Sequence, residues 1–274
     1  MAPLVIKLGG SAKIDLGNFL DDLATLNQPY VLVHGAHDEL DLLSRNLGHE
    51  PRLVTSATGQ VSRYTDAATM DLFLMAYCGK VNKRIVSALL RRGVRAVGLS
   101  GMDGGIIQAR RKPRIRVVEN GKTKLLDGDF AGSVERVDTS LVDLLLGTGY
   151  VPVLTPPAAG REGEPLNVDG DKLAMELAVA LGAPKLLIFS DTAGLLARLD
   201  DPDSTIARID PDDLEAGLNA AQGKMKKKII AAADAVSRGV GEVILASANV
   251  PRPVRAALGR AGTRVGRGVY AAGN

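Results

Sequence analysis

The sequence predicts an α/β fold in which an open, mainly parallel central sheet lies between layers of helices. Short apolar runs alternate with longer segments of helical periodicity from the N-terminus onward, an order typical of parallel sheets. Several apolar runs end in glycine-containing loops, the position at which parallel sheets bind ligands. One stretch departs from this alternation, because two extended runs flank Asn120-Gly121 and predict a β-hairpin inserted into the fold.

The first half of the chain contains three predicted strands and the helices between them. The strands are expected at residues 4–8, 29–33 and 95–99, and the first two helices at 15–26, opened by Asp15, and 38–46. Residues 53–92 are expected to be mostly helical, with Thr65 as a helix N-cap and an interruption at Gly79. Residues 100–105 then turn the chain into the hairpin, whose strands are expected at 114–118 and 122–126.

The second half of the chain repeats the alternation of strands and helices. Helices are expected at residues 141–146, 172–181 and 251–258, and strands at 151–154, 185–189 and 242–246, with a final edge strand at 262–265. We expect two lobes that share one continuous sheet, the first formed by residues 1–180 and the second by residues 181–274.

Composition restricts the classes of protein to which the chain can belong. Of its 274 residues, 46% are apolar, which is enough for a large core. The single Cys78 excludes internal disulfides, and no Cys and His have metal-ligand spacing, so we expect a reducing compartment and no structural zinc. We see neither a signal peptide nor a membrane-spanning stretch, which predicts a cytoplasmic protein. The low net charge of +3 and the absence of tryptophan argue against a nucleic acid partner.

The first predicted strand leads into a candidate anion site. Lys7 lies within the strand, and Gly9 and Gly10 follow at its end. Glycines let backbone N–H groups approach an oxyanion closely, and the lysine adds a positive charge beside them. A strand and turn with a surface lysine is the alternative that these residues alone leave open.

A second basic segment begins a predicted amphipathic helix in the C-terminal part of the chain. Residues 224–228 hold four lysines around Met225, and apolar residues continue at helical spacing to Val236. Cations at a helix N-terminus oppose its dipole by about 0.3–1 kcal/mol each. A bound polyphosphate would offset this cost for at least one lysine, whereas a solvated face is the favoured interpretation for Lys226 and Lys227.

Several of these segments, taken in order, resemble the amino acid kinase family over nearly the whole chain. They are Lys7 to Gly10, His34-Gly35, Arg63 with Thr65-Asp66, residues 79–83, Asn167 to Asp171, Ser190-Asp191 with Gly194-Leu195, Gly223 to Lys228 and residues 262–265. Their order and spacing are similar to those of N-acetylglutamate kinases. A further set resembles the branch that acts on aminoadipate or glutamate linked to a carrier protein: residues 59–63, 77–79, 98–101, 110–112 and 154–158.

The resemblance implies transfer of the ATP γ-phosphoryl group to a side-chain carboxylate, which gives an acyl phosphate. A carboxylate is already an anionic nucleophile at pH 7, so this reaction needs positioning and charge neutralisation rather than a general base. By similarity, Lys7 and Lys228 neutralise the transferred group and Asp171 orients both lysines. The backbone N–H groups expected to assist them are those of Gly9, Gly10 and Gly35.

The same resemblance implies where ATP binds. The second lobe is expected to hold the nucleotide, near Ser190, Asp191, Gly194, Leu195 and Lys224. Mg²⁺ is expected to be held mainly by the nucleotide phosphates, with no protein ligand named. A Walker motif and a dinucleotide-binding Gly-x-Gly-x-x-Gly are both absent, which excludes P-loop and dehydrogenase chemistry. A catalytically silent regulatory module is a further alternative, but it would be expected to have lost a lysine or Asp171.

The first lobe is expected to bind the amino acid. Arg63 can hold a second carboxylate of the substrate in a bidentate manner and Asn167 would complete the clamp, whereas the alternative for Arg63 is a surface residue that caps the next helix. The family usually has a second glycine after His34-Gly35, and here Ala36 follows. Alanine can still donate its N–H if its φ is negative, so we keep Gly35 and Ala36 at the substrate, and we expect His37 at the surface near the helix N-cap.

Clusters of cationic residues bear on which of two substrates the protein uses, a carrier-linked amino acid or a free one. An acidic carrier protein would need a cationic surface beside the site, and free N-acetyl-L-glutamate would not. The candidates for carrier contact are Arg110, Arg111, Lys112, Arg114 and Arg116, with Lys80, Lys83 and Arg84. The alternative is a solvated hairpin whose charge prevents aggregation. The family resemblance also favours a homodimer.

Overall fold

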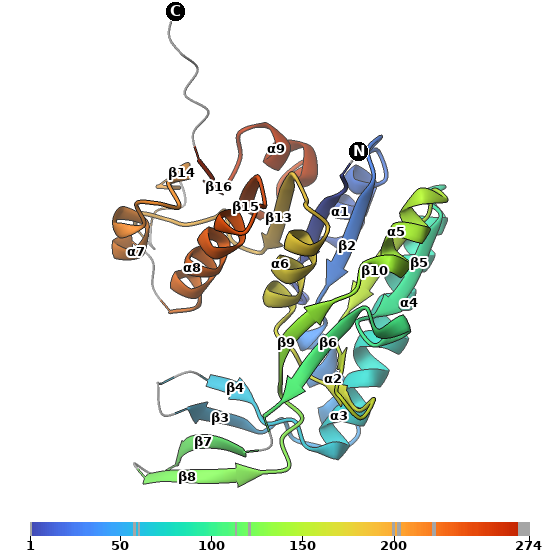
Figure 1. The fold of residues 1–274 in the computed structure, drawn as a ribbon, viewed down its shortest axis with the longest axis vertical. Coiled ribbons are helices and arrows are strands. Elements are labelled where there is room, and N and C mark those ends of the chain that lie inside the picture. The colour runs from blue at the N-terminus through green and yellow to red at the C-terminus, as the bar shows by residue number, and fades with distance from the viewer. Residues whose placement is uncertain are drawn as a thin grey trace, which may run out of the picture.

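The computed structural model describes residues 2–56, 59, 61–112, 114–119, 122–198, 201, 204–220 and 223–267. Its centre is an eight-stranded sheet in the order β14-β16-β15-β13-β1-β2-β10-β5 (Figure 1). The strands are β1 (Leu4–Leu8), β2 (Tyr30–His34), β5 (Ala96–Ser100), β10 (Val151–Thr155), β13 (Lys185–Ser190), β14 (Arg208–Ile209), β15 (Glu242–Ser247) and β16 (Thr263–Val265). Every pair is parallel except β15 with β16, so the predicted mainly parallel sheet is confirmed.

Helices cover both faces of this sheet. They are α1 (Leu16–Leu23), α2 (His37–Asn46), α3 (Ala67–Leu74), α4 (Asn82–Leu90), α5 (Ser140–Gly147), α6 (Gly170–Ala180), α7 (Glu215–Ala220), α8 (Gly223–Ser237) and α9 (Pro253–Gly259). Strand β1 is buried on both sides, and its side chains alternate between two cores. Val5 packs in the core of α6 and α8, and Ile6 in the core of α1, α4 and α9. Figure 1 shows α6 and α8 side by side over one face.

The expectation of a mostly helical stretch at residues 53–92 is wrong for its first part. Residues 53–63 form β3 (Leu53–Ser56) and β4 (Val61–Arg63), which pair with each other and, through β3, with the hairpin. β-branched residues such as Val54 and Val61 favour this extended conformation. The helix begins later than expected, because the side chain of Asp66, not of Thr65, accepts the capping hydrogen bond from the Thr69 N–H, at 2.8 Å.

Gly79 does not interrupt the helix that contains it. It lies inside the π-helical segment η1 (Met75–Val81), which continues directly into α4. A π-helical turn takes up one extra residue while the hydrogen-bonded path continues. The break expected from glycine is therefore replaced by a local widening of one continuous helix.

Two small sheets are added to the central one. The hairpin β7 (Arg114–Glu119) and β8 (Lys122–Asp127) is confirmed, although its Asn120-Gly121 turn lies outside the described residues. With β3 and β4 it forms a sheet in the order β4-β3-β7-β8 at one end of the molecule (Figure 1). A second sheet, which the sequence did not predict, contains β6 (Ile107–Arg111), β9 (Gly132–Val137), β11 (Ala158–Ala159) and β12 (Pro165–Leu166).

The end of the chain differs from the expected edge strand. β16 lies between β15 and β14, so β14 forms that edge of the sheet. No helix in the described part of the chain is long and apolar enough to cross a bilayer. Since β13 pairs directly with β1, the two expected lobes share one sheet.

The buried carboxylate of Asp22 connects α1 to α9. Asp22 of α1 accepts hydrogen bonds from the Val254 and Arg255 N–H groups, at 2.7 and 2.9 Å, at the start of α9. No side chain of α9's own N-cap residue makes this bond. Asp22 therefore caps a helix that lies more than 200 residues further along the chain.

Replacing Asp22 with alanine is expected to lower the free energy of unfolding by about 1–3 kcal/mol, because two buried N–H groups lose their acceptor. Denaturant unfolding would measure this change. The matched control is Asp21→Ala, which removes only an exposed ion pair with Arg92 and should cost about 1 kcal/mol or less. Equal losses in the two variants would contradict a capping role for Asp22.

Candidate active site

A carboxylate between two lysines forms the centre of the candidate site. The Lys7 Nζ lies 2.6 Å from Asp171 Oδ1, and the Lys228 Nζ lies 3.1 Å from Asp171 Oδ2. Strand alternation directs Lys7 to the same face as Val5, which is the face that α6 and α8 cover. Asp171 lies in the first turn of α6, and Lys228 in α8. The three residues expected to act together are thus brought together from distant parts of the chain.

The electrostatics of this cluster favour an ionised carboxylate. Burial alone would raise the pKa of Asp171, but the ammonium groups of Lys7 and Lys228 more than offset it and hold the pKa at about 2. Asp171 therefore stays charged at neutral pH and is a poor proton acceptor. Two cations and one anion leave an excess positive charge, which suits a site for a phosphoryl group.

The glycine loops lie as expected, but their N–H groups are used differently. The Gly9 N–H donates to the Phe189 carbonyl at 2.9 Å, and the Gly35 N–H donates to the Leu8 carbonyl at 3.1 Å. The expectation that these two amides are free to bind an anion is wrong in this conformation, because they hold the loops to neighbouring strands. Within the described residues, the Gly10 N–H makes no hydrogen bond.

Gly10 is required where the loops after β1 and β2 meet. A Cβ at this position would lie 2.4 Å from the Ala36 nitrogen, which no side chain could tolerate. Ala36 has a φ of −153°, so the residue that replaces the expected second glycine adopts the negative φ that the sequence analysis required. His37 begins α2 with its side chain more than half exposed and beside Asp38, as expected for a surface residue.

The two expected substrate ligands lie on neighbouring segments. Arg63, at the end of β4, forms an ion pair with Asp41 of α2 through its Nη2. Its Nη1 is buried without a hydrogen-bond partner among the described residues. The Asn167 Nδ2 donates to Thr65 Oγ1 at 3.0 Å, which links the loop before α6 to the end of β4. A buried guanidinium nitrogen without a partner is suited to a ligand carboxylate.

Of the residues expected to bind the nucleotide, Ser190 is the last residue of β13, and Asp191, Gly194 and Leu195 lie in the loop that follows. A hydrogen bond from β16 fixes this loop. The Leu195 N–H donates to Thr263 Oγ1 at 2.8 Å. At Gly194, with a φ of +136°, a Cβ would lie 2.7 Å from the same oxygen. The Leu195 side chain is buried in the core and not available to a ligand, whereas Ser190 is half-buried and Asp191 exposed. The side chain of Lys224 lies outside the described part of the structure.

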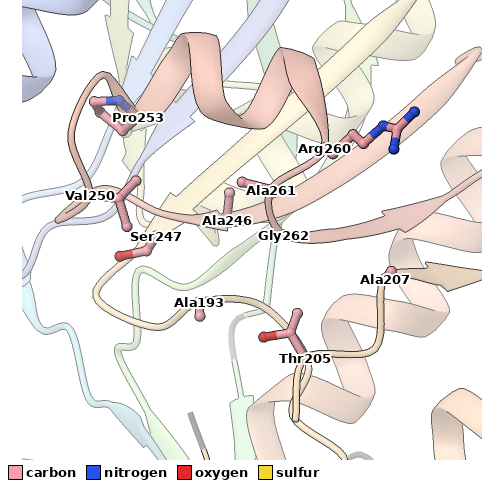
Figure 2. A pocket seen from close by; sticks show the side chains of 10 residues that line it. All are labelled: Ala193, Thr205, Ala207, Ala246, Ser247, Val250, Pro253, Arg260, Ala261 and Gly262. Atoms are coloured by element: carbon pink, nitrogen blue, oxygen red, sulfur yellow. The ribbon is translucent and has the colours of Figure 1, made fainter. Parts of the chain in front are cut away.

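A pocket of about 330 Å³ borders this loop. Figure 2 shows that small side chains line it, among them Ala193, Ala246 and Ser247, while Arg260 lies at its margin. Ala246 and Ser247 form the end of β15, the strand next to β13. The space therefore lies near the carboxyl ends of parallel strands, where α/β sheets bind ligands.

Comparison with known proteins identifies the family. The family model described as "Amino acid kinase family" matches residues 2–247. The chain belongs to the amino acid kinase family. A relative named [LysW]-aminoadipate kinase, from Deinococcus radiodurans, is 49% identical over 96% of this chain and 91% of its own length. The relative of the same name from Thermus thermophilus is 45% identical over 96% of this chain and 99% of its own length.

Solved structures of other enzymes share the fold. N-acetylglutamate synthase from Neisseria gonorrhoeae, complexed with coenzyme A and N-acetyl-glutamate, superimposes with a TM-score of 0.78 at 23% identity, over 98% of this chain and 60% of that chain. Carbamate kinase from Giardia lamblia bound to AMP-PNP gives a TM-score of 0.68 at 15% identity, over 96% and 98% of the two chains. These likenesses support the α/β fold.

Six of the eight cations expected to contact a carrier have partners within this amino acid kinase. Lys83 donates to the Gly98 carbonyl at 3.0 Å, and Arg111 donates to the Asp129 carbonyl at 3.0 Å while lying over the Phe130 ring. Four others have carboxylate partners: Lys80 and Arg84 with Glu39, Arg110 with Glu135 and Arg114 with Asp127. Lys112 and Arg116 are exposed.

The sequence analysis did not identify two acidic residues that contact the expected substrate-binding segments of this kinase. Asp41 holds Arg63, but in sequence it is one of several acids on an exposed helix. The Asp129 carboxylate, almost fully buried, accepts from the Thr65 and Ala131 N–H groups at 3.1 and 3.2 Å. Burial raises the pKa of Asp129 above its usual value. Its place after the hairpin in Asp127-Gly128-Asp129 was the only available signal, and it indicates a turn.

Thr263 was named from sequence only within the family segment 262–265, and its contact with Leu195 gives a testable prediction. Thr263→Val is expected to lower the free energy of unfolding by about 1–3 kcal/mol, because the Leu195 N–H loses its acceptor. It should also raise the KM for ATP, since the loop after β13 loses its anchor. Thr263→Ser keeps the oxygen and should retain both properties. A valine variant with an unchanged KM for ATP and unchanged stability would contradict this role.

Proposed function

We propose that this amino acid kinase uses ATP to phosphorylate the side-chain carboxylate of aminoadipate or glutamate whose amino group is joined to a LysW-type carrier protein. The product is an acyl phosphate, a step suited to lysine or arginine biosynthesis. The observation that carries the kinase assignment is the convergence of Lys7 and Lys228 on Asp171. The relatives named for LysW-linked aminoadipate, at 45–49% identity, support the substrate.

The chain's own residues can perform this transfer without a general base. The substrate carboxylate is already ionised at neutral pH, so the protein needs to align it and neutralise the charge of the transferred group. Lys7 and Lys228 supply that neutralisation, and the ionised Asp171 holds both ammonium groups in place. Fixed donors of this kind are effective because they need no reorganisation during the reaction.

Arg63 and Asn167 would hold the amino acid itself. The Arg63 Nη1, which has no hydrogen-bond partner among the described residues, would bind the second carboxylate of the substrate, while Nη2 stays on Asp41. Asn167 is linked to Thr65, which lies two residues after Arg63, because its amide donates to the Thr65 hydroxyl. This arrangement would place the side-chain carboxylate of the substrate toward the lysines.

ATP would lie across the second lobe, residues 181–274, and supply the phosphoryl group. Ser190, Asp191 and Gly194 are suited to its nucleoside part. The Gly10 N–H, which makes no hydrogen bond within the described part of the chain, and the excess positive charge of the lysines are suited to its phosphates. Mg²⁺ would be held mainly by those phosphates.

We further propose, from family membership, a homodimer in the cytoplasm.

Acyl phosphate formation trapped with hydroxylamine tests the proposal. The assay compares LysW-linked aminoadipate, LysW-linked glutamate and free N-acetyl-L-glutamate, each at low and high salt. We expect turnover only with carrier-linked substrates, and a kcat/KM that falls with salt because charge steers the encounter. Robust turnover of free N-acetyl-L-glutamate would overturn the carrier assignment, and failure of all three substrates would overturn the kinase assignment.

A further inference from the structure

The four-stranded sheet β4-β3-β7-β8 has two unlike faces. In its antiparallel pairing, Val54 stands opposite Ser62, and Val117 opposite Lys124. Cross-strand partners lie on the same face of a sheet, and residues one apart lie on opposite faces. Val54 and Val117 share one face by this register, and both are buried. This face therefore buries its valines, although Ser62, Lys122 and Lys124 on the same face remain exposed.

The opposite face exposes apolar side chains. Leu53, Val61 and Leu125 lie on it, with exposed fractions of 63%, 54% and 57%. Thr55 pairs with Val61 on one side and Val118 on the other, which makes a row across three strands of the same face. Three large apolar residues exposed on one face of a small sheet indicate a surface that another molecule covers.

Cations border these apolar residues on the same face. Arg63 stands opposite Leu53, and Arg116 stands opposite Leu125. Arg114, two residues before Arg116, pairs with Asp127, and both side chains remain largely exposed. Arg63 also belongs to the candidate substrate clamp, since its Nη1 has no hydrogen-bond partner in the part of the chain that the structure describes. The face of the sheet that carries Leu53 and Leu125 therefore also carries Arg63, the residue expected to bind the amino acid.

We propose that this surface, formed by Leu53, Val61, Arg63, Arg114, Arg116 and Leu125, is where the substrate-bearing segment of the acidic carrier docks. The inference rests on the proposed function and names the part of the protein that recognises the carrier. The occupant is an extended segment with apolar and carboxylate side chains that ends in the amino acid held by Arg63. Apolar side chains of the segment cover the two leucines and Val61, and its carboxylates meet Arg114 and Arg116.

The charges on this face disfavour a second copy of the chain as the occupant. A two-fold contact brings the same patch of both copies together, so Arg114 and Arg116 of one copy would approach those of the other. Like charges placed together in this way oppose association. An acidic partner has the complementary charge. Of the eight cations expected from sequence to contact a carrier, only Arg114 and Arg116 lie on this face.

Matched substitutions on the two faces test the proposal. The KM for LysW-linked aminoadipate is expected to rise about tenfold in the Leu53→Ser/Leu125→Ser double variant and in Arg116→Glu, with kcat and the KM for ATP changed by less than about twofold. The controls are Leu47→Ser, an exposed leucine at the end of α2, and Lys122→Glu, an exposed cation on the other face of the hairpin. Neither control should change the KM of the carrier-linked substrate by more than about twofold.

The outcomes separate this inference from the proposed function. Arg116→Glu should also weaken the dependence of KM on salt, whereas Lys122→Glu should not. Wild-type turnover of the carrier-linked substrate with equal KM values in face variants and controls overturns the docking surface alone. Absence of wild-type turnover overturns the proposed function. If the double leucine variant does not fold, Arg116→Glu against Lys122→Glu remains decisive, because both are exposed charge reversals on the same hairpin.

Discussion

Replacing Lys228 with methionine is expected to lower kcat by about 10²–10³, with little change in the KM for the carrier-linked amino acid. Methionine keeps much of the side chain's length and removes its charge. Asp171 would then face Lys7 alone, so the excess positive charge that suits the transferred group would be lost. Steady-state acyl phosphate formation, trapped with hydroxylamine, measures the effect.

Lys226→Met provides the control for Lys228→Met. Lys226 is exposed on the same helix, two residues earlier, and has been interpreted from sequence as part of a solvated face. Its replacement should change kcat by less than about twofold. Equal losses in the two variants would show that the general charge of α8 matters, and would contradict a specific role for Lys228. Lys7→Met should match Lys228→Met, because both ammonium groups contact the same carboxylate.

Replacing Arg63 with lysine is expected to raise the KM for the carrier-linked amino acid by about 10–100-fold, at nearly constant kcat. Arginine can hold Asp41 with Nη2 and still offer Nη1 to a ligand. A lysine ammonium is a single centre of charge and cannot serve both partners with the same geometry. Initial rates over a range of carrier-linked substrate, at saturating ATP, separate KM from kcat.

Arg161→Lys controls for the loss of a guanidinium as such. Arg161 is an exposed arginine that pairs with Glu135, and its replacement should leave both kinetic constants within about twofold. An Arg63→Lys variant that lowers kcat and leaves KM unchanged would contradict substrate binding as the role of Arg63. A raised KM for ATP in place of the amino acid would contradict it as well.

The sequence predicted the parts of the fold that depend on local pattern. The buried strands β1, β2, β10, β13 and β15 lie within a residue or two of their expected bounds, because each is a short apolar run ended by polar or glycine residues. The hairpin was predictable from Asn120-Gly121. Strands β3 and β4 were not, since they are short, partly polar and stabilised by a hairpin about 60 residues away.

Some residues of the candidate site were predicted from sequence and others were not. Lys7, Asp171 and Lys228 were named from family resemblance, and the structure brings them together. Asp41 and Asp129 were missed because nothing in their own neighbourhood distinguishes them from ordinary surface or turn residues, and Thr263 was named only within the family segment 262–265, without a role. Each acts through a partner distant in sequence, such as Thr65 for Asp129 and Leu195 for Thr263. Such roles can be recognised only from a structure that shows which distant segments of the chain are in contact.

The pairing of β1 with β13 has a consequence for the synthesis of the protein. β1 leaves the ribosome long before β13, yet β13, one of its two neighbours in the sheet, begins only at Lys185, and the second lysine of the cluster comes later still. Parallel pairing over so long a separation is slow to form. A nascent chain that lacks α8 would hold Lys7 and Asp171 without the second cation. The pair of lysines around Asp171 is therefore complete only after α8 has been made and has packed beside α6.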